Sequence, residues 1–173
     1  MDKHSIIVII ASIIIAIPFV YSGFNIYAVN QLQIHGTDEE IFRFFDMIND
    51  GSIKVCNPTP FFVSFNKLSI VTNFDSYNKG TFSSKPISLL PLSSAVINGT
   101  FSSESFSEAQ YLALHFDGIF GGSIPERIDP RRLVITTEID APIIGLIPFT
   151  VTKQYSGLFF WETLNGDIGE FNC

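Results

Sequence analysis

The hydrophobic pattern of the chain begins with one long apolar run near the N-terminus. Residues Ile6–Val29 carry no charge, and Ser12, Ser22 and Asn25 are among their few polar interruptions. A helix that spans a bilayer needs about 20 mostly apolar residues, and it satisfies its own backbone hydrogen bonds in lipid. The pattern therefore predicts that residues 1–29 form an N-terminal transmembrane anchor, which contacts the lipid bilayer through Ile6–Val29.

The charges that flank this run indicate its orientation. Lys3 and the α-amino group precede the run, whereas the first charges after it are Asp38, Glu39 and Glu40. The excess of positive charge on the cytoplasmic side of membrane helices favours a cytoplasmic N-terminus, a single pass through the cell membrane and an extracytoplasmic C-terminal domain. The alternative is a signal peptide cleaved near Gly23 or Ala28, although the run exceeds the usual apolar length of about 7–15 residues. Either interpretation exports the rest of the chain.

The segment 30–51 follows as a membrane-proximal region with one short helix. Thr37–Glu40 has the spacing of a capping box, and Gly51 stands where a glycine commonly ends a helix. Apolar residues recur between them at helical spacing: Ile41, Phe44, Phe45 and Ile48. We expect a short amphipathic helix over residues 38–49.

From residue 52 onward the pattern changes to the two-residue period of β-strands. Ile53 and Val55 alternate with polar neighbours, and Asn57–Pro60 interrupts the strand because proline lacks a backbone donor. After the break, Phe61, Val63 and Phe65 are expected on one face and Phe62 on the other. Alternation puts Cys56 opposite Val55, which favours an outward-facing Cys56; the alternative is that it points into the sandwich as a small apolar side chain.

Further strands and one helix complete the predicted domain, 52–173. Strands are expected from Gly80, over Ala95–Ser102, over Leu133–Ile139 and Ile147–Tyr155 as a hairpin, and over Leu158–Trp161 as a final strand. One helical face is traced by Phe106, Ala109, Leu112, Ala113, Phe116 and Phe120, and Gly121–Gly122 ends it. The predicted fold is mainly β: an antiparallel fibronectin- or immunoglobulin-like β-sandwich with one long connecting helix.

Several of these segments together resemble a known family. The segment 55–70, which contains Asn57-Pro58-Thr59-Pro60, is similar to the strand pair of the late-embryogenesis-abundant type 2 family, also called the WHy domain. Leu90–Ser94, the helix at 106–120 and the hairpin at 137–149 resemble that family's proline–serine step, helix and closing hairpin. The resemblance implies a seven-stranded sandwich without an active site, and a role in stress protection. The helix at 38–49 departs from the family pattern.

Composition narrows the range of partners. Of 10 basic and 17 acidic residues only Lys3 and Asp2 precede Val29, so the exported part keeps the net charge of −7. An acidic surface disfavours nucleic acid and anionic lipid headgroups. We therefore expect no nucleic acid partner, and a protein of the membrane or envelope is the expected partner besides the bilayer.

Candidate chemistry supports two functional hypotheses. The first is a non-enzymatic, membrane-anchored domain that acts by binding or shielding, as an accessory subunit of a membrane complex, in envelope interaction or in stress protection. The second is a metal-dependent or hydrolytic enzyme that uses His115 with Cys56, Glu138 or Asp140. The first is favoured, with no cofactor, because the sequence contains no nucleophile motif and no pair of residues at metal-ligand spacing.

Two further features concern modification. Cys56 and Cys173 are the only cysteines, and in an exported domain they either pair or stay as two thiols; the sequence leaves both open. Asn98-Gly99-Thr100 is an acceptor sequence for N-glycosylation.

The predicted topology can be tested with protease. Added to intact cells, protease should remove the domain after about residue 29 and spare the N-terminal peptide, because only the former is exported. Immunodetection of tags at the two ends measures this. A protected domain, or a mature N-terminus near Phe24 or Val29, would contradict the predicted anchor.

Overall fold

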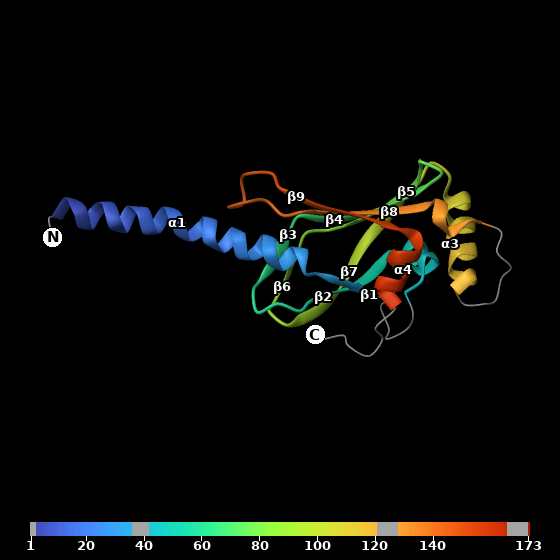
Figure 1. Cartoon of the computed structure of the whole chain (residues 1–173), viewed down its shortest axis with the longest axis horizontal. Helices are drawn as coiled ribbons and strands as arrows, with labels where there is room; N and C mark the ends of the chain where they lie inside the picture. Colours follow the sequence, from blue (N-terminus) through green and yellow to red (C-terminus); the bar gives the residue numbers. More distant parts are fainter. Residues whose placement is uncertain (1–2, 36–41, 121–127, 166–172) are drawn as a thin grey trace.

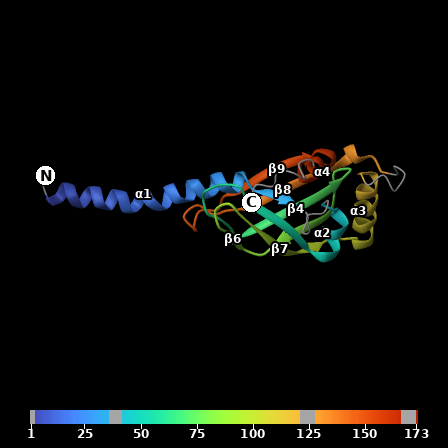
Figure 2. The ribbon, with the colours of Figure 1, turned by 90° about the horizontal axis from the view of Figure 1, so that it is seen from below.

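The computed structural model describes residues 3–35, 42–120, 128–165 and 173. A long helix, α1 (Lys3–Asn30), projects from one end of a mainly antiparallel β domain, as Figures 1 and 2 show from two sides. Its length and composition are sufficient to cross a membrane. The mainly β, antiparallel character expected from the sequence is confirmed, as is the N-terminal helix.

Antiparallel pairing joins most strands into one seven-stranded sheet. In sheet order these are β1 (Gln33–His35), β2 (Ser52–Asn57), β7 (Ser93–Ser102), β5 (Tyr77–Ser84), β4 (Lys67–Phe74), β8 (Leu133–Asp140) and β9 (Thr150–Ser156). Two short strands, β3 (Val63–Phe65) and β6 (Ile87–Leu89), pair separately. The sheet curls, so apolar residues from its β2 end and from β4 and β8 lie in one core.

Strand β7 makes the sheet continuous by changing its partner halfway. Residues 93–98 of β7 pair with β2, and residues 99–102 pair with β5. Gly99 lies at the change, where a Cβ atom would stand 2.5 Å from both a ring carbon of Phe82 and the carbonyl oxygen of Ser83. Only glycine fits such a close approach, so this residue permits the two halves of the curled sheet to share a strand.

Three helices cover the end of the core away from the projecting half of α1. They are α2 (Phe44–Asp50), α3 (Phe106–Phe120) and α4 (Gly157–Asn165), and a short 3-10 turn, η1 (Pro130–Arg132), precedes β8. Helix α3 has the bounds expected from the sequence, and it buries Ala109, Leu112, Ala113 and Phe116. Phe106, expected on the same face, is exposed, and the Phe120 side chain lies outside the described part.

The final strand predicted over Leu158–Trp161 is wrong, because these residues belong to helix α4. Strand β9 ends at Ser156, whose Oγ accepts a hydrogen bond from the backbone N–H of Phe159, 3.2 Å away. This serine caps the helix, and Phe160 and Leu164, four residues apart, then share a buried face. The cap and the helical spacing together override the strand preference of an aromatic run.

Helix α2 is shorter than the predicted 38–49, and its N-terminus is satisfied differently. The proposed capping box at Thr37–Glu40 lies outside the described residues, whereas Gly51 ends the helix in a left-handed conformation, as expected. Asp117 of α3 accepts hydrogen bonds from the backbone N–H groups of Phe44 (3.0 Å) and Phe45 (2.8 Å). A carboxylate from a neighbouring helix thus binds the free donors of the first turn.

This contact makes stability depend on pH. Burial raises the pKa of Asp117 from 3.8 to about 6, against the opposing effect of its two backbone donors. Between pH 3.8 and about 6 the folded state therefore keeps Asp117 protonated, while the unfolded state has released that proton. The stability present below pH 3.8 is lost as the pH rises through about 6. Asp117→Asn, which cannot ionise, should remove this loss, on the order of 1–3 kcal/mol. Urea unfolding of the full chain in micelles measures it, and parallel pH profiles for the two proteins would contradict the assignment.

Candidate functional site at the helix-to-sheet junction

The last turns of α1 are part of the β domain. From Ile6 to Tyr21 the large apolar side chains of the helix are exposed, but Ala28 and Val29 are fully buried against the domain core. Ser22 and Asn25, on the same side of the helix, are buried as well. The helix therefore has an exposed apolar half and a docked half.

Hydrogen bonds to backbone groups fix the docked half. The Asn25 amide donates from Nδ2 to the carbonyl oxygen of Ser64 (2.9 Å) and accepts at Oδ1 from the Ser64 N–H (2.7 Å). Lys153 of β9 donates from Nζ to the carbonyl oxygen of Asn30 (2.6 Å) at the helix end. These contacts come from two different strands, β3 and β9, and they meet the helix at two points, so they hold both the position and the direction of α1.

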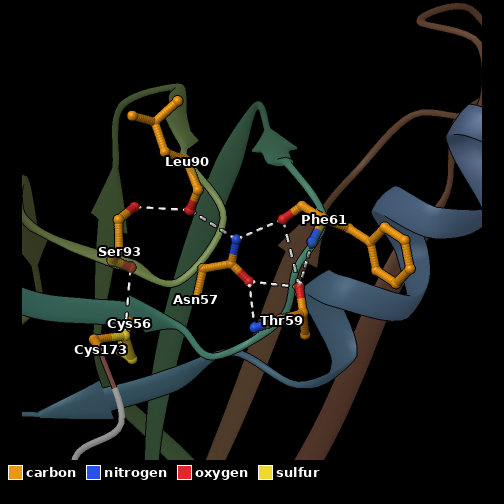
Figure 3. Close-up of a disulfide and its surroundings, with 7 residues drawn as sticks. All are labelled: Cys56, Asn57, Thr59, Phe61, Leu90, Ser93 and Cys173. Atoms are coloured by element: carbon orange, nitrogen blue, oxygen red, sulfur yellow. Dashed lines mark hydrogen bonds between the residues drawn. A yellow bond between two sulfur atoms is a disulfide. The ribbon is translucent and has the colours of Figure 1, made fainter.

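The proline-rich break after β2 forms the surface on which α1 packs. Figure 3 shows the Asn57 side chain at its centre, where Nδ2 donates to the carbonyl oxygens of Phe61 (2.7 Å) and Leu90 (3.0 Å). Its Oδ1 accepts from the N–H (3.1 Å) and the hydroxyl (2.7 Å) of Thr59. Asn57 is fully buried, so these four bonds use its amide completely.

This network positions an aromatic contact with the helix. The Phe61 ring stacks on Phe24 with centroids 4.5 Å apart, and Tyr27 meets it edge-on at 6.2 Å. Val63 and Phe65 are buried and Phe62 is exposed, as the alternation predicted. The prolines predict that Asn57–Pro60 interrupts the strand, and in the structure this segment also connects the sheet to α1.

A disulfide lies beside this junction. Cys56 is bonded to Cys173, with the two Cα atoms 5.9 Å apart, and the bond ties the end of the chain to β2 (Figure 3). The expectation that Cys56 faces outward is wrong, since it is fully buried. Cys56 lies on the face of β2 opposite Val55, but its bond to Cys173 covers the sulfur atom.

A groove of about 450 Å³ opens next to the junction, between the two edges of the curled sheet. It is lined on one side by Leu32, Gln33 and His35, and on the other by Tyr155 of β9 and Thr163 of α4. Burial, with a smaller contribution from Lys54, lowers the pKa of His35, and burial raises the pKa of Tyr155. Both side chains are therefore uncharged near pH 7. The mixed polar and apolar lining suits a polypeptide segment or a small polar ligand.

The residues of the enzyme hypothesis do not form one site. His115 lies buried on α3, where its ring packs on Tyr111 and Nδ1 is 2.9 Å from the Tyr111 carbonyl oxygen. Figure 1 shows α3 at the end of the domain away from α1, whereas Cys56 lies at the junction and is in a disulfide. Glu138 and Asp140 follow each other on one face of β8, opposite Thr152 and Thr150 of β9. In the described ranges no group of three or more acidic, histidine or cysteine residues is arranged to hold a metal ion.

Asn98 is exposed on β7, next to the strand crossing at Gly99. An exposed position is a requirement for glycan attachment, and glycosylation stays a prediction.

Sequence reasoning missed the two asparagines that organise the junction. The sequence shows Asn25 only as a polar interruption of an apolar run, and Asn57 only as the first residue of a strand break. A signal was present for the first: Ser22 and Asn25 are three residues apart and face one side of the helix. For Asn57 the partners are backbone groups, one of them 33 residues away, so nothing in the sequence marks them.

A comparison with known families finds a match over part of the chain. Residues 39–116 are similar to the C-terminal domain of the pilus assembly chaperone PapD. This finding makes the resemblance to the late-embryogenesis-abundant type 2 family wrong, together with the stress role taken from it. The motifs behind that resemblance are local: Asn57-Pro58-Thr59-Pro60 ties a loop to the sheet, which is a task of turns in many β folds.

Among solved structures, a protein from Archaeoglobus fulgidus is similar over 73% of this chain and 94% of its own, with 11% identity and a TM-score of 0.30. A likeness this distant supports no inference about function. No curated protein matches the chain.

The pairing of Cys56 with Cys173 can be measured directly. Mass spectrometry of the full chain purified from membranes without reductant should show the two cysteines in one linked peptide pair. Cys56→Ser should lower the free energy of unfolding by up to about 4.7 kcal/mol, the loop-entropy value for a loop of about 100 residues. Reduction of the native protein should produce the same loss and should not affect Cys56→Ser. Two free thiols in the native protein would contradict the pairing.

Proposed function

We propose that this chain is a single-pass membrane protein whose immunoglobulin-like β-sandwich is exported and acts without catalysis, by binding a protein partner. The observation that carries the proposal is the docking of α1 on the domain through Asn25 and the buried Ala28 and Val29. A domain held in this way presents its faces at a fixed orientation to the bilayer, which suits binding within or beside a membrane complex.

Two features support export. The exposed apolar half of α1 is long enough to span the hydrocarbon core, with Lys3 at its far end. The disulfide between Cys56 and Cys173 belongs in an oxidising compartment, because thiols stay reduced in the cytosol. The N-terminus is then cytoplasmic and the domain extracytoplasmic.

Two features support protein binding. The similarity at 39–116 is to a domain of a protein described as a pilus assembly chaperone, whose work is on other proteins. The groove beside the junction is bordered by β9, the last strand of the described sheet, and an edge strand can pair with an incoming polypeptide. The proposed role is therefore that of an accessory subunit that holds or shields a partner at the membrane surface.

Site-specific photocrosslinking in native membranes tests this. A photoreactive amino acid at Gln33 or Thr163, both exposed on the groove, should yield one discrete protein adduct after irradiation. Ser105 serves as the matched control, because it is exposed just before α3 and does not line this groove. Adducts at all three positions, at Ser105 alone, or at none would contradict a protein partner on this face.

A further inference from the structure

The loop between β8 and β9 has a composition that is unusual for a hairpin tip. Residues 143–149 read Ile-Ile-Gly-Leu-Ile-Pro-Phe, and no charge occurs between Asp140 and Lys153. Leu146 is 81% exposed, Ile147 47% and Phe149 37%. Hairpin tips are normally polar, because they lie in water. A continuous exposed apolar tip indicates a contact with an apolar environment.

The backbone of this tip adds a second indication. The tip closes through hydrogen bonds from the N–H groups of Leu146 (3.1 Å) and Ile147 (3.0 Å) to the carbonyl oxygen of Ile143. Ile144 is in the left-handed region, at a φ of 50°. Glycine, asparagine or aspartate is usual there, and a β-branched residue is strained. The turn thus carries an apolar side chain where conformation alone would favour a small or polar one.

The position of the loop identifies what it contacts. The N–H of Ile144 donates to Oγ of Ser22 on α1, 2.7 Å away, so the tip is attached to the helix. Both Figure 1 and Figure 2 show the β8–β9 loop at the end of the domain from which α1 projects, beside the helix. Ser22 lies 19 residues after Lys3, which is about 28 Å along a helix. The hydrocarbon core of a bilayer is about 30 Å thick, so Ser22 lies where α1 leaves it.

We propose that the loop 143–149 inserts its apolar tip into the bilayer interface beside α1 and gives the domain a second contact with lipid. This inference rests on the proposed membrane anchoring by α1. The loop has no cation and the chain has a net charge of −7, so insertion depends on apolar contact and does not need anionic headgroups. The hydrogen bond between Ile144 and Ser22 fixes the depth of the loop tip in the bilayer. With this second contact with lipid, the domain cannot tilt about the end of α1.

Tryptophan fluorescence in vesicles tests the inference on the full chain. The protein has one tryptophan, Trp161, so Trp161→Phe provides a background without tryptophan. Single tryptophans are then placed at Leu146 in the tip, at Ile10 in the exposed half of α1, and at Tyr77. Tyr77 is the matched control, since it is an exposed hairpin residue (71%) on the β4–β5 turn, away from α1. The three proteins are reconstituted in phosphatidylcholine vesicles with and without brominated acyl chains.

Leu146→Trp should show blue-shifted emission and lose at least half as much intensity to brominated lipid as Ile10→Trp, whereas Tyr77→Trp should lose none. If Ile10→Trp is quenched and Leu146→Trp is not, the loop inference fails and the anchor stands. If neither is quenched, membrane anchoring itself fails. A blue-shifted but unquenched Leu146→Trp would place the tip against protein and would also overturn the inference.

A second measurement avoids the Trp161→Phe background. A diazirine amino acid replaces Leu146, Ile10 or Tyr77 in the otherwise native chain, and irradiated vesicles are analysed by mass spectrometry. Phosphatidylcholine adducts are expected at positions 146 and 10 and not at 77. Absence of lipid adducts at 146, with adducts present at 10, would overturn the insertion of the loop.

Discussion

The paired amide of Asn25 is the contact on which the arrangement of this protein depends. An amide within an apolar helix is costly to bury unless its donor and acceptor are both bonded, and one unsatisfied group costs about 1–3 kcal/mol. The Ser64 backbone supplies both partners, at 2.9 and 2.7 Å. Any rotation or sliding of α1 would break this pair, so the polar residue fixes the helix against the domain more strictly than apolar packing could.

The surrounding structure is arranged to keep that contact in place. The Asn57 network holds Phe61 against Phe24 of the helix. The disulfide between Cys56 and Cys173 ties β2 to the end of the chain. Lys153 of β9 donates a hydrogen bond to the carbonyl oxygen of Asn30, the last residue of α1. Helix α1 and the β domain consequently form one unit. In the proposed role, the groove between β1 and β9 then faces a partner at a height and angle set by the bilayer.

The sequence predicted those elements that depend on local pattern. Helix α3 has the bounds given by its apolar spacing, and the break at Asn57–Pro60 follows from proline chemistry. The final strand at Leu158–Trp161 was wrong because an aromatic run favours a strand until a serine cap and an i, i+4 burial pair outweigh it. The junction was out of reach, since Asn25 bonds a backbone 39 residues away and the cysteine pairing spans 117 residues. The family resemblance failed for a related reason: it rested on turn motifs that many β folds use.

Hydrogen exchange at the Ser64 amide tests the docking of α1 most directly. The full chain in lipid nanodiscs is compared with Asn25→Ala by amide-resolved exchange, with Ile70, a buried residue of β4 that pairs with β5 and β8, as the internal reference. The account predicts a slowly exchanging Ser64 amide in the native protein and at least tenfold faster exchange in Asn25→Ala, while Ile70 exchanges equally in both. Equal exchange of the Ser64 amide in the two proteins would contradict the claim that α1 and the β domain form one rigid unit.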